Sequence, residues 1–253
     1  MRNRFEVRKL RDLGKRVPGL QFVYHKYLKL RDMLIGLFLR SQSTEKVFAD
    51  IYAGKKWGGE TSVSGPGSEL DQTREISKEL PSILHDLDIR TVLDIPCGDF
   101  HWMKHVDMTG IKYTGADIVP NLIHDNRTTY ERENVKFLVA NLINDKLPKV
   151  DLILCRDCLV HLSFKDIFLA LHNVCDSGSK YLLTTTFTRR KNNHDIATGQ
   201  WRALNMEAAP FMLPEPLKTI SEQSTEGNGA YTDKALSLWE ISDIETSFET
   251  PDS

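Results

Sequence analysis

A short apolar run that ends in an acid and a glycine constrains the fold of this chain more than any other feature. Residues 91–100 read Thr-Val-Leu-Asp-Ile-Pro-Cys-Gly-Asp-Phe. The β-branched and leucine side chains predict a buried strand that ends at Asp94, and Gly98 predicts a tight turn just after it. The first strand of an open α/β sheet brings its backbone to a nucleotide-like ligand in this way.

A second strand that ends in an acid follows at residues 112–117, which read Lys-Tyr-Thr-Gly-Ala-Asp. Asp117 follows Asp94 by about 20 residues, the spacing expected when the second acid binds the hydroxyls of a ribose. The two acids predict a site for a cofactor that contains adenosine. The alternative is an ordinary strand, turn and helix of a doubly wound fold, without a ligand.

The charges near the turn distinguish between adenosine cofactors. A dinucleotide needs three glycines and a helix N-terminus without anions, because its pyrophosphate lies against bare backbone N–H groups. In this chain Pro96 and Phe100 replace expected glycines, and the carboxylate of Asp99 would repel a phosphate. S-adenosylmethionine carries an ammonium and a sulfonium group and no phosphate, so we expect it rather than NAD.

These residues resemble the first motif of the class I S-adenosylmethionine-dependent methyltransferases, an acid followed by a Gly-x-Gly-type turn. Asp94, Gly98 and Asp117 fit the motif, and Pro96 departs from it because proline cannot adopt the left-handed conformation open to glycine. Asn141 stands where the family commonly has an acid that contacts the adenine amino group, and an amide oxygen accepts the same bond. The resemblance implies these cofactor-binding residues: Asp94, Pro96, Cys97, Gly98, Asp99, Asp117, Ile118, Asn141, Leu142 and Arg156.

Strands and helices alternate over the region of the resemblance, from about residue 70 to residue 241. Apolar patterns predict further strands at residues 135–139, 150–155 and 180–187. Ser163 predicts the start of a helix over residues 164–174. We therefore expect an α/β fold with a doubly wound, mainly parallel sheet and with ligands at the carboxyl ends of its strands.

The resemblance also supplies the strand count, which is seven, with a final antiparallel strand. That strand is expected at residues 235–241, paired with residues 217–222. We expect three parts along the chain: a basic N-terminal helical extension over residues 1–46, the methyltransferase domain over residues 47–241 and a frayed polar tail over residues 242–253.

Charge is distributed unevenly between these parts. The chain of 253 residues has a formal net charge of −2, which gives no general argument for nucleic acid as a partner. Residues 1–46 contain 12 Lys or Arg and 4 Asp or Glu, so they carry +8 and the remainder carries −10. Within this basic arm, residues 27–40 mix apolar and basic side chains in the manner of an amphipathic helix.

Three interpretations of the basic arm stay open. Its helix packs on the catalytic domain, as apolar stripes usually do, or it docks on an anionic membrane or a lipid-linked substrate, or it binds RNA. Its apolar run is shorter than the roughly 20 residues that span a bilayer, and we see no signal-peptide pattern. We therefore expect a cytoplasmic protein, with peripheral membrane contact as one interpretation.

The cysteines agree with that compartment. Cys155 and Cys158 have C-x-x-C spacing, but no second pair and no Cys/His cluster at zinc spacing follows. We interpret the four cysteines as reduced thiols and expect no metal.

Two further segments have an unusual composition. Residues 57–68 place Trp57 among glycines and serines, which suits a lid that covers the cofactor, although a surface Ω-loop is the alternative. Residues 193–216 follow the fifth strand, and their polar and aromatic side chains suit a polyhydroxylated acceptor. The candidate substrate-binding residues are Trp57, His194, Asp195, Trp201, Arg202 and Asn205.

Asp157 and His161 are the candidates for catalysis. Positioning dominates methyl transfer, but a hydroxyl acceptor benefits from a base that removes its proton. The two residues stand at i and i+4, so a helix after the fourth strand would place both on one face. His161 has a second interpretation, which is to orient the loop, and His194 with Asp195 is an alternative pair. Two ligands are too few to argue for a magnesium site.

The segments around Asp94 and Arg156 are also similar to a group of bacterial methyltransferases and to a viral glycan-modifying methyltransferase domain. This resemblance implies O-methylation of a sugar or glycan hydroxyl, so we expect a small-molecule or glycan acceptor and no nucleic acid. Two alternatives remain: methylation of a nitrogen or of a small-metabolite hydroxyl, and a cofactor-binding protein without activity. The oligomeric state stays open.

Overall fold

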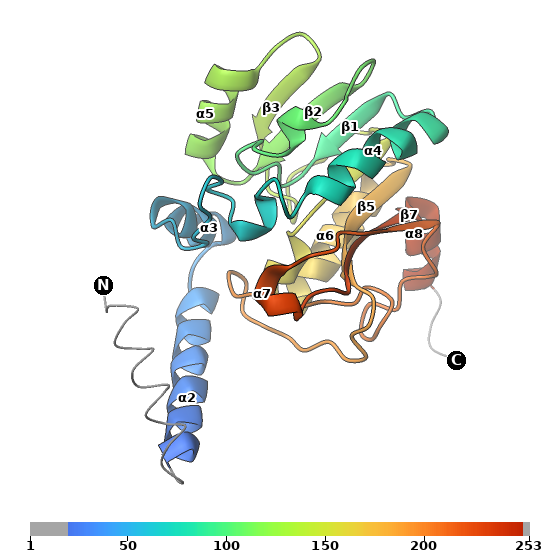
Figure 1. The fold of residues 1–253 in the computed structure, drawn as a ribbon. Coiled ribbons are helices and arrows are strands. Elements are labelled where there is room, and N and C mark those ends of the chain that lie inside the picture. The colour runs from blue at the N-terminus through green and yellow to red at the C-terminus, as the bar shows by residue number, and fades with distance from the viewer. Residues whose placement is uncertain (1–19, 250–253) are drawn as a thin grey trace. The chain divides into compact units, whose positions relative to one another are not determined.

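The computed structural model describes residues 20–249 and divides into two units, Met1–Gln42 and Ser43–Ser253. The described part of the first unit is the helix α2 (Leu20–Arg40), drawn in blue in Figure 1. The expected N-terminal helical extension is therefore present, and its residues 1–19 lie outside the described residues. None of the helices within residues 20–249 has the length and the apolar character needed to cross a membrane.

The second unit contains one seven-stranded sheet with the strand order β3-β2-β1-β4-β5-β7-β6 (Figure 1). Neighbouring strands from β3 to β5 pair in parallel, and β7 is antiparallel to both β5 and β6. The prediction of a mainly parallel, seven-stranded sheet with a final antiparallel strand is confirmed. The strands are β1 (Thr91–Asp94), β2 (Lys112–Asp117), β3 (Val135–Val139), β4 (Leu152–Cys155), β5 (Tyr181–Phe187), β6 (Lys218–Ser221) and β7 (Lys234–Glu240).

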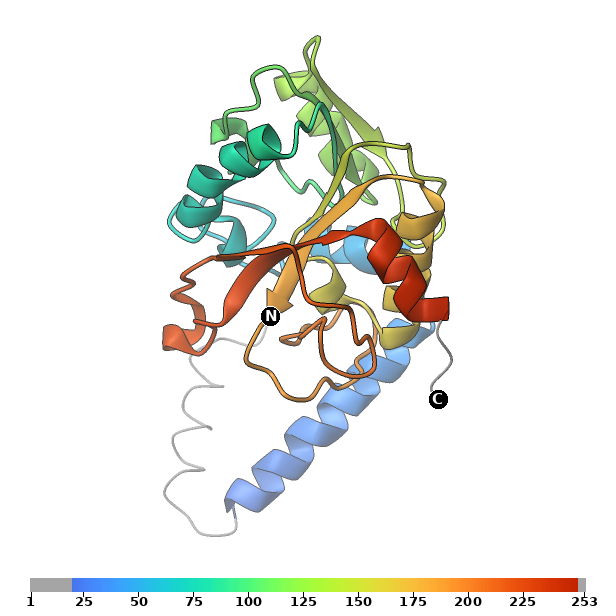
Figure 2. The same ribbon diagram turned by 90° about the vertical axis from the view of Figure 1, so that its right-hand side faces the viewer.

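Helices cover both faces of the sheet. The apolar side of α4 (Arg74–Asp86) joins a core cluster that contains alternate residues of every strand, and α5 (Pro120–Tyr130) packs against β2 and β3. α6 (Phe164–Asp176) and α8 (Ile241–Glu249) contact each other on the opposite side from α4 (Figure 2). Because both faces are covered, every residue of β4 and β5 is buried.

The remaining elements connect this framework. α3 (Thr44–Ala53) begins the second unit, and its N-cap Ser43 accepts a hydrogen bond from the backbone of Lys46. α3 runs through residue 46, where we expected the arm to end. The short elements are α7 (Glu226–Gly229) and the 3-10 helices Pro66–Ser68, Met103–His105 and Leu159–His161.

The start of α6 follows the sequence prediction, with one addition. Ser163 Oγ accepts a hydrogen bond from the backbone N–H of Asp166 at 3.2 Å. The backbone N–H of Ser163 donates to Thr198 Oγ1 at 2.9 Å, and the Thr198 hydroxyl donates to the Asp166 carboxylate. Thr198 therefore completes the cap and ties the segment after β5 to α6.

The C-terminal segment corrects one expectation. Residues 242–249, expected as a frayed tail, belong to the helix α8. Ile241 and Ile244 are buried, so these two apolar side chains anchor the start of the helix. Residues 250–253 of the expected tail lie outside the described residues.

Candidate functional site

A cavity of about 420 Å³ lies at the carboxyl ends of the parallel strands. One part of its wall consists of residues at the ends of β1, β2 and β3, namely 94–98, 117–119 and 140–143. We call this part the β1–β2 end. β1 and β4 are neighbours in the sheet but not in sequence, and α/β folds bind ligands at such switch points. The sheet thus places the cavity where the sequence predicts a ligand.

The turn after β1 needs its glycine. Gly98 has a φ of +54°, and a Cβ atom on it would collide with Ser64 Oγ. The carbonyl of Gly98 accepts a hydrogen bond from Asn126 Nδ2 at 2.7 Å, and the N–H of Cys97 donates to the Ala116 carbonyl at 2.7 Å. These bonds fix the turn against β2 and α5.

Two buried carboxyl groups line the β1–β2 end. Burial raises the pKa of Asp94 to about 7, although Tyr113 donates a hydrogen bond to it at 2.6 Å. Burial also raises the pKa of Asp117 to about 6, although the backbone N–H groups of Val119 and Gly98 donate to it at 3.0 and 3.3 Å. The ionised forms of both groups are poorly compensated, so a positively charged ligand would stabilise them.

Asn141 lines the cavity with a side chain that is already partly bonded. Its Nδ2 donates to Glu45 Oε1 at 2.7 Å, and its Oδ1 accepts from the N–H of Ile143 at 2.9 Å. A carbonyl oxygen has two lone pairs, so Oδ1 can accept one further bond. Four other predicted cofactor residues line the same end: Pro96, Cys97, Ile118 and Leu142.

Asp99 is the one predicted cofactor residue that does not line the cavity. Its carboxylate binds the 57–68 loop and accepts hydrogen bonds from residues 62–64 at 2.8 to 3.2 Å. Glu69 accepts the backbone N–H groups of residues 60–62. Although desolvation opposes it, the hydrogen bond from the Thr61 hydroxyl together with these backbone bonds lowers the pKa of Glu69 to about 2. Two carboxylates therefore fix the loop beside the cavity.

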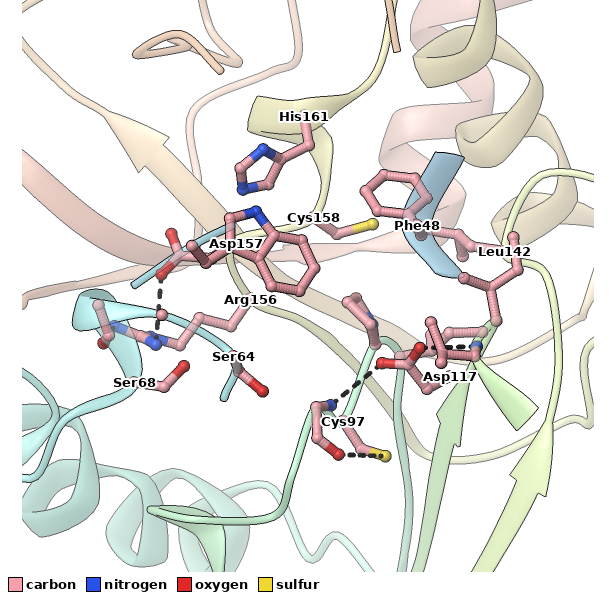
Figure 3. A pocket seen from close by; sticks show the side chains of 18 of the residues that line it. Phe48, Ser64, Ser68, Cys97, Asp117, Leu142, Arg156, Asp157, Cys158 and His161 are labelled. Carbon is pink, nitrogen blue, oxygen red and sulfur yellow. Dashed lines mark hydrogen bonds and ion pairs between the residues drawn. The ribbon is translucent and has the colours of Figure 1, made fainter. Parts of the chain in front are cut away.

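Trp57 brings this loop to the cavity wall. Its ring centroid lies 5.8 Å from that of His161 and 6.3 Å from that of Phe48 on α3. Figure 3 shows Asp117 on one side of the cavity and His161 with Asp157 on the other. The predicted catalytic residues and the predicted cofactor residues other than Asp99 thus face one continuous space.

A buried cluster of charged side chains, the ion cluster, forms the wall after β4. Arg156 binds both carboxylate oxygens of Glu222 at 2.6 and 3.1 Å, and it donates to the Gly67 carbonyl at 2.8 Å. Lys234 Nζ lies 2.7 Å from the Asp157 carboxylate and 3.3 Å from that of Glu222. The ion cluster joins the loop, the end of β4 and the β6–β7 hairpin.

Asp157 differs from the sequence expectation in conformation and in charge. It has a φ of +53°, and the following 3-10 helix begins at Leu159, so Asp157 and His161 do not share a helical face. Burial by itself would raise the pKa of Asp157, but the charges of Lys234 and Arg156 hold it well below its ordinary value. A carboxylate stabilised in this way is a poor proton acceptor.

His161 has the opposite character. Its Nδ1 lies 2.9 Å from the carbonyl oxygen of Gln200. A carbonyl oxygen only accepts, so Nδ1 carries the proton and Nε2 keeps a lone pair. Burial lowers the pKa of His161 below its ordinary value, so the ring is neutral near pH 7. Nε2 is therefore the basic atom of this side chain.

The candidate substrate-binding residues fall into two groups. Trp57 and Trp201 line the cavity, whereas His194, Asp195, Arg202 and Asn205 do not. His194 is exposed, and Asn205 is buried with its side chain donating to the Arg190 carbonyl at 2.8 Å.

Two of these polar side chains support the backbone near α6. The buried guanidinium of Arg202 donates to the carbonyls of Leu159 and Leu162 at 3.0 and 2.9 Å, and burial lowers its pKa to about 10. The Asp195 carboxylate accepts the N–H of Phe164 at 2.7 Å. These groups satisfy backbone atoms that α6 and the preceding 3-10 helix leave without partners.

Aromatic rings form the other part of the cavity wall, the aromatic end. The ring centroids of Trp201 and Tyr231 are 5.0 Å apart, and Phe187 lies 6.1 and 5.9 Å from them. Lys234 pairs with Phe187 across β5 and β7, and Glu226 lies 3.6 Å from Lys234. The aromatic end therefore adjoins the carboxylates of the ion cluster.

Several residues of this wall were not anticipated from the sequence. They come from α3, from the end of β5 and from the β6–β7 hairpin, and no local motif marks them. The only signal is that Tyr231 and Lys234 come shortly before the predicted last strand, residues 235–241. The residues are Phe48, Phe187, Glu226, Tyr231 and Lys234.

Comparison with protein families identifies the type of domain over part of the chain. A family model described as a methyltransferase domain matches residues 92–178, from β1 to just beyond α6. No curated protein sequence matches the chain significantly. Residues 92–178 are therefore similar to a methyltransferase domain, and the sheet that they belong to has a Rossmann-like topology.

Solved structures share this fold at low sequence identity. Human N-acetylserotonin methyltransferase in complex with S-adenosylmethionine has a TM-score of 0.52 and 13% identity over 79% of this chain, which spans 60% of that protein. Magnesium protoporphyrin IX methyltransferase from Synechocystis with bound S-adenosylhomocysteine has a TM-score of 0.56 and 10% identity, with 78% of this chain and 99% of that chain covered. The N-methyltransferase NodS from Bradyrhizobium japonicum has a TM-score of 0.50 and 15% identity, with coverages of 67% and 96%.

The ion cluster leads to a prediction about stability. Lys234→Met leaves one buried cation, Arg156, among three carboxylates, so we expect the free energy of unfolding to fall by about 3–5 kcal/mol. Urea denaturation measures the change. Lys218→Met, at an exposed position of β6, is the matched control and should be nearly neutral. A loss below about 1 kcal/mol in the Lys234 variant, as for a surface ion pair, would contradict this account.

Proposed function

We propose that this protein is an S-adenosylmethionine-dependent methyltransferase that methylates a hydroxyl group of a sugar or glycan. The methyltransferase domain and the cavity at its strand edge support the reaction class. The main support for a hydroxyl acceptor is the basic Nε2 of His161, because a hydroxyl must lose a proton when it is methylated.

The residues at the β1–β2 end fit the cofactor. The glycine turn lets the backbone approach a ligand closely, and the Asp117 carboxylate suits the two hydroxyls of a ribose. Asp94 adds a second buried acid, which suits a ligand with positive charges. Arg156 and Lys234 are both engaged in ion pairs, so they give little support to a pyrophosphate.

When bound, S-adenosylmethionine supplies a methyl group activated by a sulfonium, and the carbon–sulfur bond breaks as the group leaves. His161 Nε2 takes the proton that the acceptor hydroxyl loses as its oxygen bonds to the methyl carbon. The bond from Nδ1 to the Gln200 carbonyl orients the ring and stabilises the imidazolium that forms. Trp57 packs against His161 and excludes water from this step.

In this proposal Asp157 is not the base that the sequence suggested. Its stable negative charge does not take up a proton, but it remains a hydrogen-bond acceptor in the cavity wall. With Glu226 it offers carboxylate oxygens to neighbouring hydroxyls of a polyol.

The aromatic end supports a sugar as the acceptor. A sugar ring has an apolar face of C–H groups, which packs on aromatic rings, and a rim of hydroxyls, which carboxylates bind. The cluster of Trp201, Tyr231 and Phe187 beside Glu226 offers both surfaces.

The affinity for the cofactor tests the first part of the proposal. Asp117→Ala removes a charge-assisted bond worth about 1.5–3 kcal/mol, so affinity for S-adenosylmethionine should fall roughly tenfold or more. Isothermal titration calorimetry measures it. Asp86→Ala, which removes an exposed acid from α4, is the control and should bind normally. Equal affinities in the two variants would remove Asp117 from the site.

The raised pKa values of Asp94 and Asp117 predict a pH dependence of binding. Because these values are about 7 and about 6, both groups are partly protonated at pH 6 and mostly ionised at pH 8. A cationic ligand prefers the ionised forms, so affinity should rise as pH rises through this window, with protons released on binding. Calorimetry in buffers of different ionisation enthalpy counts those protons, and binding without proton release would refute the prediction.

The catalytic assignment is tested by turnover. Methyl-labelled cofactor is incubated with neutral sugars and glycans, phosphorylated sugars, amines and RNA, and the labelled acceptor is then used to compare variants. His161→Ala should lose about 10²- to 10⁴-fold in turnover while cofactor affinity is kept. Wild-type turnover should fall as pH drops through the lowered pKa of His161, because the base must be neutral.

His194→Ala is the matched control because His194 is exposed and does not line the cavity. It should turn over normally. Label found on amines alone would refute O-methylation, and so would near-normal turnover of the folded His161 variant on a hydroxyl acceptor.

A further inference from the structure

The helix α2 exposes an apolar stripe that the catalytic cavity does not explain. Five large side chains recur at helical spacing along it, and each is more than half exposed. They are Tyr27 at 55%, Leu30 at 51%, Leu34 at 55%, Leu37 at 60% and Phe38 at 64%. Single exposed apolar residues are common on proteins, but a contiguous stripe marks an interaction surface.

Basic residues flank this stripe. At 100° per residue, Lys26 and Arg31 fall on the two sides of these five side chains, and both are exposed. Met33, which is 55% exposed, lies just beyond Lys26 and widens the apolar surface on that side. The surrounding residues 1–46 carry +8, whereas the rest of the chain carries −10. The stripe is therefore apolar in its centre and has positive residues at its sides. Such a surface is complementary to a partner with an anionic surface layer above an apolar interior.

We propose that α2 lies in the surface of an anionic lipid membrane, with the stripe in the acyl boundary and Lys26 and Arg31 among the headgroups. Basic amphipathic helices bind membranes in this way. The proposal is independent of the methyl-transfer reaction, because it concerns lipid binding alone.

A second copy of α2 is a poorer occupant. The spacing of Tyr27, Leu30, Leu34 and Leu37 also suits the a and d positions of a coiled coil. Lys26 and Arg31 would then take the g and e positions, where they would face like charges of the other helix. Self-pairing would concentrate the positive charge that anionic lipid neutralises.

Vesicle co-sedimentation with the full chain tests the proposal. The wild type should bind vesicles of phosphatidylserine and phosphatidylcholine and should bind pure phosphatidylcholine much more weakly. Binding should fall steeply between 0.1 and 1 M salt, because the screening length shortens from about 10 to about 3 Å. Leu34→Glu with Leu37→Glu should weaken binding at least about tenfold, since two apolar side chains leave the membrane.

Two further variants make the test specific. Lys26→Glu with Arg31→Glu keeps the stripe and reverses its borders, and it should also lose binding to anionic vesicles. Leu217→Glu replaces a leucine that is 54% exposed in the other unit, so it is a matched control and should bind as the wild type does.

Three outcomes would overturn the proposal. They are no vesicle binding by the wild type, equal binding to neutral and anionic vesicles, and a Leu217 variant as impaired as the Leu34 and Leu37 variant. Sedimentation velocity identifies the rival occupant: a wild-type dimer that Leu34→Glu with Leu37→Glu dissociates, without vesicle binding, would assign the stripe to a second copy.

Discussion

The guanidinium of Arg156 carries a permanent charge inside the protein, and the cavity depends on how that charge is neutralised. Glu222 binds it from the β6–β7 hairpin, Asp157 from the end of β4, and the Gly67 carbonyl from the loop. Leaving a buried charge without its partner costs about 3–5 kcal/mol. These segments, which are distant in sequence, must therefore meet in one arrangement, and that arrangement forms the wall beside the predicted catalytic residues.

The same ion cluster gives different roles to Asp157 and His161, which the sequence suggested as a catalytic pair. Lys234 and Arg156 stabilise the charge of Asp157, so its carboxylate binds and does not take up protons. His161 stands next to this cluster, but its proton is fixed on Nδ1 by a backbone carbonyl. Neighbouring charges thus make Asp157 a poor base, whereas a backbone carbonyl leaves Nε2 of His161 as a basic atom.

Local sequence predicted well those features that follow from backbone geometry. The strands at residues 112–117 and 135–139 were expected with the bounds that the structure shows, because both contain the β-branched and aromatic residues that favour strands. Asp94, Gly98 and Asp117 reach the cavity because the ends of parallel strands meet at one edge of a sheet. Such positions depend on short stretches of chain.

The partner of a polar side chain could not be predicted in the same way. Asp99, Arg202 and Asp195 have the composition of a binding site, yet the first holds a loop and the other two satisfy backbone groups near α6. Local sequence shows what a group can bond but not what stands within 3 Å of it. That neighbour is set by the crossing of distant segments.

The sequence alone determined the parallel strands, their ligand edge and the acids and glycine at that edge, since these follow from periodicity and turn chemistry. The strand count of seven came from the family resemblance. Only the tertiary structure decided that Lys234, Phe187 and Tyr231 join the predicted Trp201 in the cavity wall. These residues arrive from the end of β5, the loop after it and an antiparallel strand formed late in the chain. Their meeting is fixed by side-chain packing and buried charge, which act between segments that no local pattern connects.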